Sequence, residues 1–537
     1  MEQQLTLDQI QSFKGKYPKQ IWSLFFSEMW ERFCFYGMRG MLTYFMVTHL
    51  ILNNGEHMSP VQANLQYGAT QAFVYAFTFI GGLFADKILG FRKSLFWGGL
   101  MMIIGSAILA INPFPENQFF LGISFTIIGT GFFKPNISTM VGSLYKRGDY
   151  RRDAGFSLFY SGINIGALIG GYACIAIGKG QLLGGVIPEQ YRWNVAFGLA
   201  GLVMIISLIN FLLTKKNLGP IGLSPFKWQD DTVERIPETG GIETMKTNPV
   251  EIPHKIKSGK KWYDYAVYAG SLIAIPIIMT MVAKTEYTDW FMYIIGPATL
   301  LYLFYEMTKV TAAERKKLWA ALIFIIFSII FWAFFEQSGG SLSLFAAHNL
   351  DDTALGFIHL DPNGVNNSAN SLFVIIFAPI VGIVWIALAK KKIEPNTVVK
   401  FGLGFLFLAG AFFTFYATRF FAIDGVANLD VFALAYLVIT FGELCLSPIG
   451  LSIMTKLSPQ KLQGMMMGMW FLASAYGQYV AGLLGAGMAE GTQNDSLVQK
   501  LHTYTDGYRQ LAIYALIAGV VLIIISPLVR KLMQEVK

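Results

Sequence analysis

Residues 21–50 read IWSLFFSEMWERFCFYGMRGMLTYFMVTHL, an apolar run that carries four charged side chains. At 100° per residue, these four and two aromatic residues share one helical face: Glu28, Glu31, Arg32, Phe35, Tyr36 and Arg39. A charge at the centre of a bilayer costs at least ~2.5–3.5 kcal/mol, so a stripe of four is not expected to face lipid. The stretch therefore predicts a membrane-spanning helix whose charged face lines an ion or substrate pathway.

The whole chain has the composition of a helical membrane protein. Of its 537 residues, 54% are hydrophobic and 14% are charged, whereas soluble domains carry about 25% charged residues. Apolar runs of bilayer length recur throughout and lack the period-two alternation of a transmembrane barrel. We predict an all-α polytopic fold with fourteen spans: 21–50, 66–86, 94–112, 119–143, 155–178, 192–213, 264–283, 290–308, 318–345, 370–390, 400–421, 430–455, 464–487 and 508–531.

Lysine and arginine are distributed unevenly between the two sides that these spans define. With both termini on one side, that side collects 32 of the 41 Lys and Arg residues, and three more lie within spans. The opposite side has six: Lys179, Arg192, Lys284, Arg419, Lys500 and Arg509. By the positive-inside rule, both termini are expected in the cytoplasm. The net charge of +8 follows from this topology, so we expect a lipid bilayer and no nucleic acid as partner.

The sequence carries no signal for an enzyme, a metal site or a disulfide framework. Its three cysteines, Cys34, Cys174 and Cys445, lie singly in apolar runs, and its six histidines lack ligand spacing. It contains no HExxH motif, no nucleophile paired with a base and no phosphate-binding glycine loop. The first 20 residues are polar, and the next segment is too long and too charged for a cleavable signal peptide. We expect a multi-pass protein without catalytic residues, metal or cofactor.

One long polar interruption, residues 214–262, separates six spans from eight. The next two spans lack intramembrane charges and are interpreted as an inserted hairpin outside the working machinery. Removing this hairpin leaves six spans on each side, the layout of transporters whose two bundles rock around a site near the membrane midplane. The predicted divisions are an N-terminal bundle at 1–213, a cytoplasmic linker at 214–263, the hairpin at 264–308 and a C-terminal bundle at 309–537.

Two connections between spans attract attention. Residues 82–93, GLFADKILGFRK, resemble the cytoplasmic loop motif of the major facilitator superfamily. In this motif we expect Asp86 to cap a helix or pair across the bundle interface, and Gly90 to permit a tight turn. The resemblance and the twelve core spans together predict the major facilitator fold. The polar residues 346–369 are predicted to form an extracytoplasmic loop without an assigned function.

Three further ionisable residues lie in apolar surroundings: Lys134, Glu336 and Glu443. Together with the charges of residues 21–50 they form one set. Its three bases, Arg32, Arg39 and Lys134, lie in the first six spans, whereas Glu336 and Glu443 lie in the last six. Pairs across the two halves would form and break as the bundles rock. A buried pair contributes little net stability, because desolvation offsets much of the attraction. It serves better as a switch, since protonation of a carboxylate releases its partner. A static ion pair that only aids insertion is the competing interpretation.

Polar and aromatic residues accompany these charges. Tyr160 and Asn164 are four residues apart and share a helical face, and a buried amide needs hydrogen-bonding partners. Trp332 precedes Glu336 by one turn, and Ser447 follows Glu443 by one turn. Asn370 begins the eighth core span, and Trp470 lies in the eleventh. For each aromatic residue alone, ordinary helix packing is the competing interpretation.

Four motifs in order identify the chain as a member of a known family. Residues 28–33, EMWERF, resemble the ExxERF motif of the proton-dependent oligopeptide transporters, and residues 159–166, FYSGINIG, resemble their fifth-helix signature. Residues 335–337, FEQ, and 442–448, GELCLSP, are similar to their seventh- and tenth-helix motifs. The match covers nearly the whole chain, and the inserted hairpin resembles that of bacterial members.

The resemblance implies a symporter that imports di- and tripeptides with protons across the cytoplasmic (inner) membrane by alternating access, with no cofactor beyond the proton and no obligate protein partner. Glu28, Glu31 and Arg32 would form the proton-coupling cluster. The gating salt bridges would be Arg39–Glu336 and Lys134–Glu443. The implied substrate-binding residues are Tyr36, Arg39, Tyr75, Lys134, Tyr160, Asn164, Trp332, Glu336, Asn370, Glu443, Ser447 and Trp470.

The carried-over roles differ between these residues. Arg39 and Lys134 would attract the peptide carboxylate, Glu443 would receive the α-amino group, and Asn164 and Asn370 would hold backbone amides. Two departures from the family pattern affect these details. Members often carry Tyr-Tyr where this chain has Phe35-Tyr36, which removes one hydroxyl from the site. The proline that often follows the asparagine at position 370 is a serine here.

The sequence leaves three other functions as alternatives. The same architecture moves anions such as nitrate in plant relatives, although an acid at 443 suits an amine better than an anion. A membrane-embedded enzyme would need a catalytic motif that the sequence lacks. A peptide sensor that no longer transports is the third alternative, and the intact carboxylates of the ExxER motif argue against it.

Overall fold

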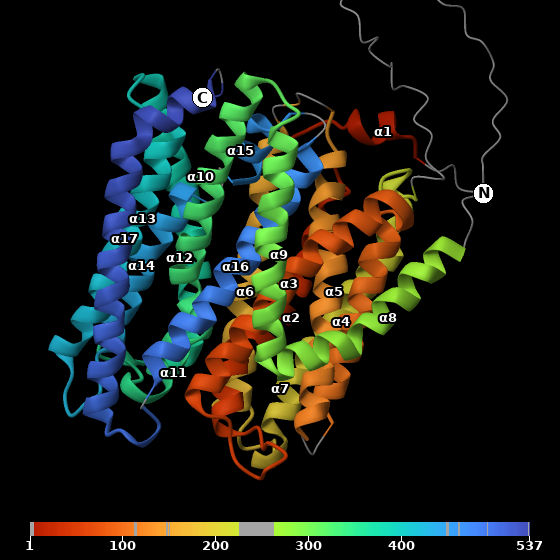
Figure 1. Cartoon of the computed structure of the whole chain (residues 1–537). Helices are drawn as coiled ribbons and strands as arrows, with labels where there is room; N and C mark the ends of the chain where they lie inside the picture. The colour runs from red at the N-terminus through yellow and green to blue at the C-terminus, as the bar shows by residue number, and fades with distance from the viewer. Residues whose placement is uncertain are drawn as a thin grey trace, which may run out of the picture.

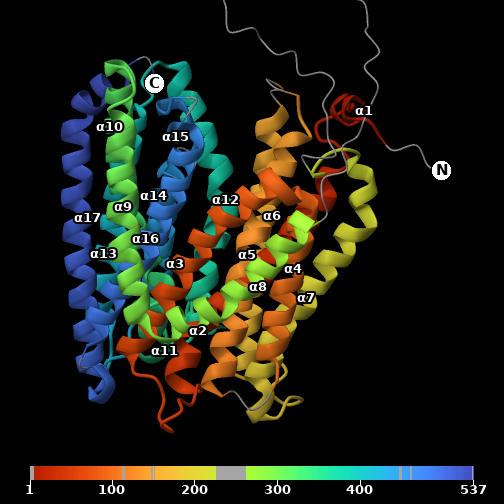
Figure 2. The same cartoon turned by 45° about the vertical axis from the view of Figure 1, so that its right-hand side comes forward.

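The computed structural model describes residues 5–111, 115–146, 149, 151–224, 262–446, 450–459, 462–490, 492–534 and 536. Long helices dominate it and stand in two side-by-side groups (Figures 1 and 2). A long helix lies at each of the fourteen predicted spans, although the predicted spans 318–345 and 430–455 run past the helix ends at Phe335 and Leu446. These helices are α2 (Ile21–Thr48), α3 (Pro60–Phe84), α4 (Phe91–Leu109), α5 (Glu116–Ser143), α6 (Arg151–Gly178), α7 (Arg192–Thr214), α8 (Trp262–Ala283), α9 (Thr285–Met307), α10 (Ala312–Phe335), α12 (Pro362–Lys390), α13 (Thr397–Ala417), α14 (Leu429–Leu446), α16 (Gln463–Ala489) and α17 (Leu497–Met533).

Short elements join these helices. They are α1 (Leu7–Gln11), α11 (Ser341–Asn349), α15 (Gly450–Leu457), a π-helical turn (Ala85–Leu89) and 3₁₀ turns at Glu189–Tyr191, Lys215–Leu218, Glu336–Gly339, Thr418–Phe421 and Thr492–Asn494. Strands β1 (Thr353–Ala354) and β2 (Ile358–His359) pair antiparallel, with Thr353 opposite His359. Within the described ranges, nine helical segments are long and apolar enough to cross a membrane by length and composition, and α2 with its four charges is not one of them.

Local sequence explains where several long helices begin. Capping boxes start α3 at Ser59, α10 at Thr311 and α17 at Ser496. In each, the N-cap hydroxyl accepts from the backbone N–H of the residue three positions later, and the side chain of that residue accepts from the N-cap backbone N–H. Asp361 caps α12, and Pro362 occupies its first position, where a missing N–H costs nothing. These polar starts fix the helix ends that face water or the opposing bundle.

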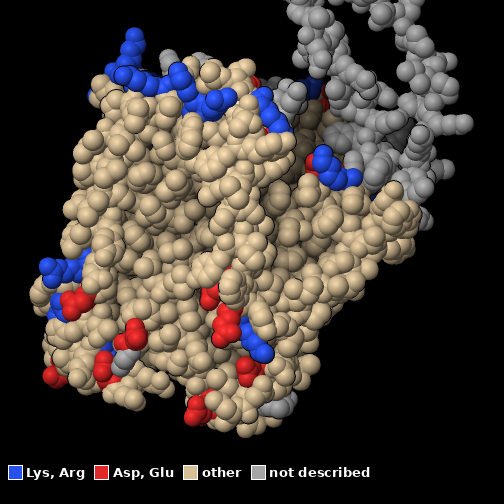
Figure 3. Space-filling model, viewed as in Figure 1, with Lys and Arg blue, Asp and Glu red and all other residues tan. Residues whose placement is uncertain are grey.

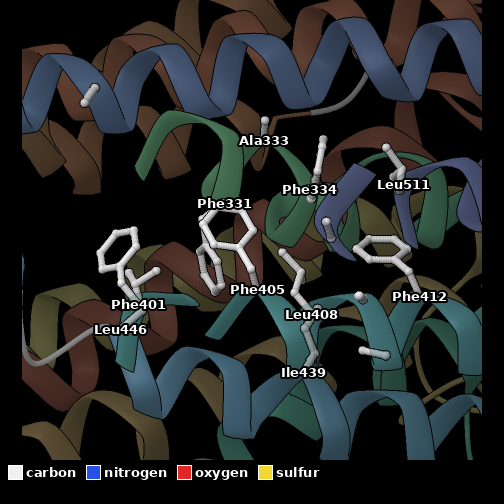
Figure 4. Close-up of a cluster of buried hydrophobic side chains, with 14 of the residues drawn as sticks. Phe331, Ala333, Phe334, Phe401, Phe405, Leu408, Phe412, Ile439, Leu446 and Leu511 are labelled. Atoms are coloured by element: carbon white, nitrogen blue, oxygen red, sulfur yellow. The ribbon is translucent and has the colours of Figure 1, made fainter. Parts of the chain in front are cut away.

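Each group of helices has its own buried apolar core. One core draws on α2–α7, and the other on α10–α17. In the C-terminal core, Phe331 of α10 meets Phe405 of α13 edge-to-face, with ring centroids 5.5 Å apart (Figure 4). Aromatic pairs of this geometry add about 0.5–1.5 kcal/mol beyond their buried area. Two separate cores allow the bundles to move against each other as units.

The bundles meet mainly at two helix pairs, α3 with α16 and α6 with α12, and α2 adds further contacts with α11, α12 and the turn after α10. The α3–α16 crossing brings two backbones into contact, because a Cβ on Gly482 would lie 2.7 Å from the Cα of Gly68 and 2.8 Å from the carbonyl oxygen of Asn64. At the α6–α12 pair, the Ser368 hydroxyl donates to the Leu168 carbonyl (3.1 Å). All buried residues of α12 lie between Pro362 and Val374, so the helix loses its packing toward the end that carries the termini.

Replacing Gly482 with alanine is expected to lower the melting temperature of the detergent-solubilised protein, because the added methyl group overlaps α3 backbone atoms. Overpacking of this kind costs about 1–3 kcal/mol. Gly487 in the same helix is the matched control, since a Cβ there meets no atom within 4 Å and alanine favours helix. Equal melting temperatures for the two variants, measured by tryptophan fluorescence, would show that the crossing tolerates the extra group.

The inserted hairpin packs against both bundles, and its expected place outside the working machinery stays a prediction. Helix α8 packs on the N-terminal bundle, where the Trp97 indole N–H donates to Ser271 (2.9 Å). Helix α9 reaches α16 of the other bundle, where the Tyr479 hydroxyl donates to Asp289 (2.6 Å). The hairpin therefore bridges the α3–α16 seam, consistent with its diagonal and upright arms in Figure 1. The predicted linker falls mainly on residues outside the described ranges.

Two expectations for connecting segments need comment. Gly90 has φ +78°, which confirms the turn expected of it. Asp86 is exposed and pairs with the neighbouring Lys87 (3.8 Å), and no pairing of Asp86 across the bundles is seen among the described residues. The loop predicted at 346–369 is also wrong in part, because α12 begins at Pro362 and adds two turns to the predicted span. Those turns are polar since they face the other bundle and not lipid.

Candidate functional site

The ExxER residues of α2 form a buried ionic cluster inside the N-terminal bundle. The Nε of Arg32 lies 3.2 Å from Glu28 and also pairs with Glu31. All three side chains are at most 2% exposed. One carboxyl oxygen of each glutamate and one guanidinium nitrogen have no hydrogen-bond partner among the described residues. The cluster is therefore held together electrostatically and keeps free acceptor positions at both carboxyl groups.

Lys134 of α5 lies near this cluster. Its ammonium lies 4.4 Å from the centroid of the Tyr75 ring, a cation–π contact with α3. Arg32, Glu31 and Glu28 lie close enough to act on its charge. The structure does not pair Lys134 with Glu443, so the predicted salt bridge is absent from this conformation and its gating role stays a prediction. The sequence shows two opposite charges but cannot show that Tyr75 and the ExxER cluster compete for the ammonium.

A second ionic contact joins the two bundles directly. Arg39 of α2 pairs with Glu336 at the end of α10, and both side chains are buried. The Nε of Arg39 also donates to the Tyr67 hydroxyl (2.7 Å), and the guanidinium lies 5.6 Å from the centroid of the Tyr36 ring. The structure thus brings together the residues that the family resemblance assigns to one gate, while their gating role stays a prediction.

Glu336 is placed by a break in the helix. The chain leaves α10 at Phe335 and forms a 3₁₀ turn at Glu336–Gly339 before α11 begins. Gln337 stabilises the turn, because its amide donates to carbonyls of α10 and α16, at Ala333 (3.1 Å) and Ala481 (3.0 Å). A 3₁₀ segment between helices often marks a hinge. Here it directs a carboxylate toward the opposite bundle.

Glu443 of α14 is held by neutral donors. The amide of Asn370 donates to one carboxyl oxygen (3.0 Å), and the Tyr160 hydroxyl donates to the other (3.3 Å). Tyr160 comes from α6, so this bond also crosses between the bundles. A carboxylate offers about four acceptor positions, so two hydrogen bonds leave room for a further donor.

These groups surround a cavity of about 100 Å³ between the bundles. Its wall combines both signs of charge with aromatic and amide groups: Tyr36, Arg39, Tyr75, Trp332, Phe335, Glu336, Ser338, Asn366, Asn367, Asn370, Ser371, Tyr436, Ile439 and Glu443. Its lining comes from α2, α3, the end of α10 with the 3₁₀ turn, the first turns of α12, and α14. It can bind a molecule that carries charges of both signs.

The sequence-predicted substrate residues divide into four groups. Seven line this cavity: Tyr36, Arg39, Tyr75, Trp332, Glu336, Asn370 and Glu443. Tyr160 reaches it through Glu443, and Lys134 through the Tyr75 ring. Asn164 and Trp470 do not line it: the Asn164 amide donates to its own helix at Tyr160 (2.9 Å), and Trp470 is buried in the C-terminal core. Ser447 lies outside the described residues.

Sequence reasoning missed the asparagines at the start of α12. Asn366 accepts from the Tyr436 hydroxyl (2.6 Å) and donates to the Ser338 carbonyl (2.7 Å), while Asn367 donates across the bundles to the Tyr36 carbonyl (3.1 Å). Tyr67, which binds Arg39, was also missed. The helix-start signal at Asp361 and Pro362 indicates that the asparagines belong to a helix and not to a loop.

The fold and the cavity define the class: a membrane transporter of the major facilitator type, with two bundles around a charged central site. Comparison with known proteins gives the family. The pattern of the POT family matches residues 92–504, and the chain belongs to that family. It is a transporter and not an enzyme.

Several proteins resemble the chain over nearly its full length. The peptide transporter YePEPT of Yersinia enterocolitica is 34% identical over 530 residues, covering 97% of this chain and 96% of that protein. A di-/tripeptide transporter of Lactococcus lactis subsp. cremoris is 30% identical and covers 97% of both chains. A crystal structure of a peptide transporter POT in complex with sulfate superposes with a TM-score of 0.76, at 30% identity over 99% of this chain and 100% of that one.

Proposed function

We propose that this protein is a proton-coupled symporter that imports di- and tripeptides by alternating access. The observation that carries the proposal is the cavity between the bundles, where Arg39, Glu336 and Glu443 present charges of both signs. The names of the relatives above support a peptide substrate. A short peptide is a zwitterion with variable side chains, so it needs fixed charges at its ends and adaptable walls between them.

Within this proposal, Arg39 and Lys134 attract the peptide carboxylate, and Glu443 receives the α-amino group. Asn370 and its neighbours Asn366 and Asn367 offer amides to the peptide backbone. Tyr36, Tyr75 and Trp332 shape the side-chain pockets. Aromatic walls of this kind accept many apolar and polar side chains, which suits a promiscuous transporter.

The proton-coupling step belongs to Glu28, Glu31 and Arg32 in this proposal. Each glutamate has a carboxyl oxygen without a partner among the described residues, so each has a position to take a proton. Protonation removes a negative charge beside Arg32 and changes the field at Lys134. The proton is the coupling ion, and the mechanism needs no cofactor or protein partner.

We propose that the described conformation faces inward. At the α6–α12 pair, the Ser368–Leu168 bond lies in the first turns of α12, and the buried part of that helix stops at Val374. Basic residues gather at the end of the C-terminal bundle that carries the C-terminus (Figure 3). By the positive-inside rule this end lies in the cytoplasm, so both termini are cytoplasmic in the inner membrane. The working divisions are the bundles 1–213 and 309–537, joined by the linker and hairpin.

Uptake of radiolabelled dialanine into proteoliposomes tests the function. Uptake is expected to be concentrative only with an imposed inward proton gradient, and to be competed by tripeptides but not by free alanine. A proton ionophore is the control, since it removes the gradient without touching the protein. Sealed vesicles that show no dialanine flux under either condition would contradict the proposal and favour another solute or a sensor.

A further inference from the structure

A second ion pair joins the bundles, apart from the central cavity. The ammonium of Lys179, just after α6, lies 3.0 Å from the carboxylate of Asp361, just before α12. Their side chains are 15% and 2% exposed. The pair lies at the end opposite the termini, and none of the motifs discussed above contains it.

The surroundings make this pair a network across the interface. From the N-terminal bundle, Lys179 also donates to Asn363 (2.6 Å), Gln181 donates to Asp361 (2.9 Å), and the Tyr172 hydroxyl accepts from the Asp361 backbone N–H (3.2 Å). The Lys179 ammonium lies 4.7 Å from the centroid of the Tyr44 ring. Four hydrogen-bonded or ionic links thus converge on the first residues of α12.

Asp361 has a second task in the same position. One of its carboxyl oxygens caps α12 by accepting from the Gly364 N–H (2.8 Å). The network therefore holds the start of the helix that carries Asn366, Asn367 and Asn370 to the cavity. A movement of Lys179 relative to Asp361 is transmitted to these amides through the rigid first turns of α12.

We propose that Lys179 and Asp361 form a clasp that closes the extracytoplasmic end of the transporter and stabilises its inward-facing conformation. This inference rests on the proposed function, because only alternating access requires that end to open. When the bundles separate there, both charges enter water and lose their mutual contact. In the closed state Asp361 is buried and Lys179 is largely covered, so removing one partner leaves the other without compensation, which is strongly unfavourable.

The test uses two variants that separate charge from helix capping. Asp361→Asn removes the charge but keeps a side-chain oxygen for the Gly364 N–H, because asparagine is a good N-cap. Lys179→Met removes the ammonium and keeps most of the aliphatic stem. Spin labels at Val186→Cys and Phe357→Cys, whose native residues are 80% and 73% exposed, report on the distance across the closed end. The three native cysteines are buried.

Both variants are expected to increase the population with a long label distance by roughly tenfold or more, measured without peptide or gradient by pulsed electron resonance. Lys400→Met is the matched control, since Lys400 pairs with Glu394 of the same bundle near the surface, and its loss should leave the distances unchanged. Melting curves identify any variant that fails to fold.

Unchanged distances in both folded variants would overturn the clasp. Because the distances are measured without substrate, they decide the clasp even if the protein carries no dialanine. A protein whose distances shift but which transports no peptide retains the clasp and loses the proposed function. A protein that takes up peptide normally but whose label distances do not shift in the variants retains the proposed function and loses the clasp.

Discussion

Glutamine at position 31 is expected to abolish gradient-driven peptide accumulation while sparing the exchange of peptide across the membrane. Glu31 is fully buried and pairs with Arg32, and one of its carboxyl oxygens has no partner among the described residues. Glutamine keeps the size of the side chain but cannot cycle between charged and neutral forms. Rocking of the bundles with bound peptide does not need that cycle, so exchange continues.

The measurement compares two assays of the same proteoliposomes. With an inward gradient of one pH unit and one proton per peptide, the wild type can accumulate dialanine about tenfold, since one unit is worth about 1.4 kcal/mol. The Glu31→Gln variant should reach a ratio of about one, and Glu28→Gln should behave alike. Glu394→Gln is the control, because this glutamate pairs with Lys400 near the surface. A variant that still accumulates peptide normally would remove its residue from the coupling mechanism.

The parts of the fold that depend on composition were predictable from the sequence. Apolar runs of bilayer length gave all fourteen spans, because the bilayer imposes the same length on each. The stripe on α2 was predictable for a related reason: helical periodicity alone places Glu28, Glu31, Arg32 and Arg39 on one face. The structure buries all four, as a charged face inside an apolar helix requires.

Pairing between residues far apart in the sequence was less predictable. Lys134 and Glu443 are opposite charges in opposite bundles, yet the ammonium lies on Tyr75 and the carboxylate binds Asn370 and Tyr160. Which partner a charge takes depends on the conformation of a rocking protein, and a sequence describes no single conformation.

The prediction of where α12 begins was wrong for a different reason. Hydropathy assigns polar segments to water, but Asn366 and Asn367 are polar because they contact the cavity and the other bundle. For the same reason the role of Asp361 was not predicted: its carboxylate caps the helix and contacts Lys179. Polar residues at a bundle interface look like a loop unless helix-start signals are considered together with hydropathy.

The second large effect concerns the recognition of the peptide amino group. Glu443→Gln is expected to weaken dialanine binding by roughly 30-fold or more, because losing one partner of a buried charge pair costs about 2–5 kcal/mol. In the structure, Tyr160 and Asn370 occupy two acceptor positions of Glu443 and leave others for an ammonium group. Glutamine preserves the shape of the site but removes its charge.

Two modified ligands make this prediction specific. N-acetyl-dialanine has no amino charge, so its already weaker binding should change less than about threefold in the variant, whereas dialanine amide keeps the charge and should lose as much as dialanine. Binding is measured by isothermal titration calorimetry of the purified protein. Because the wild type and the variant differ by one charge, a loss that depends on the ligand's amino group places that group beside Glu443. Equal losses for all three ligands would mean that Glu443 supports the shape of the cavity and that another residue receives the amine.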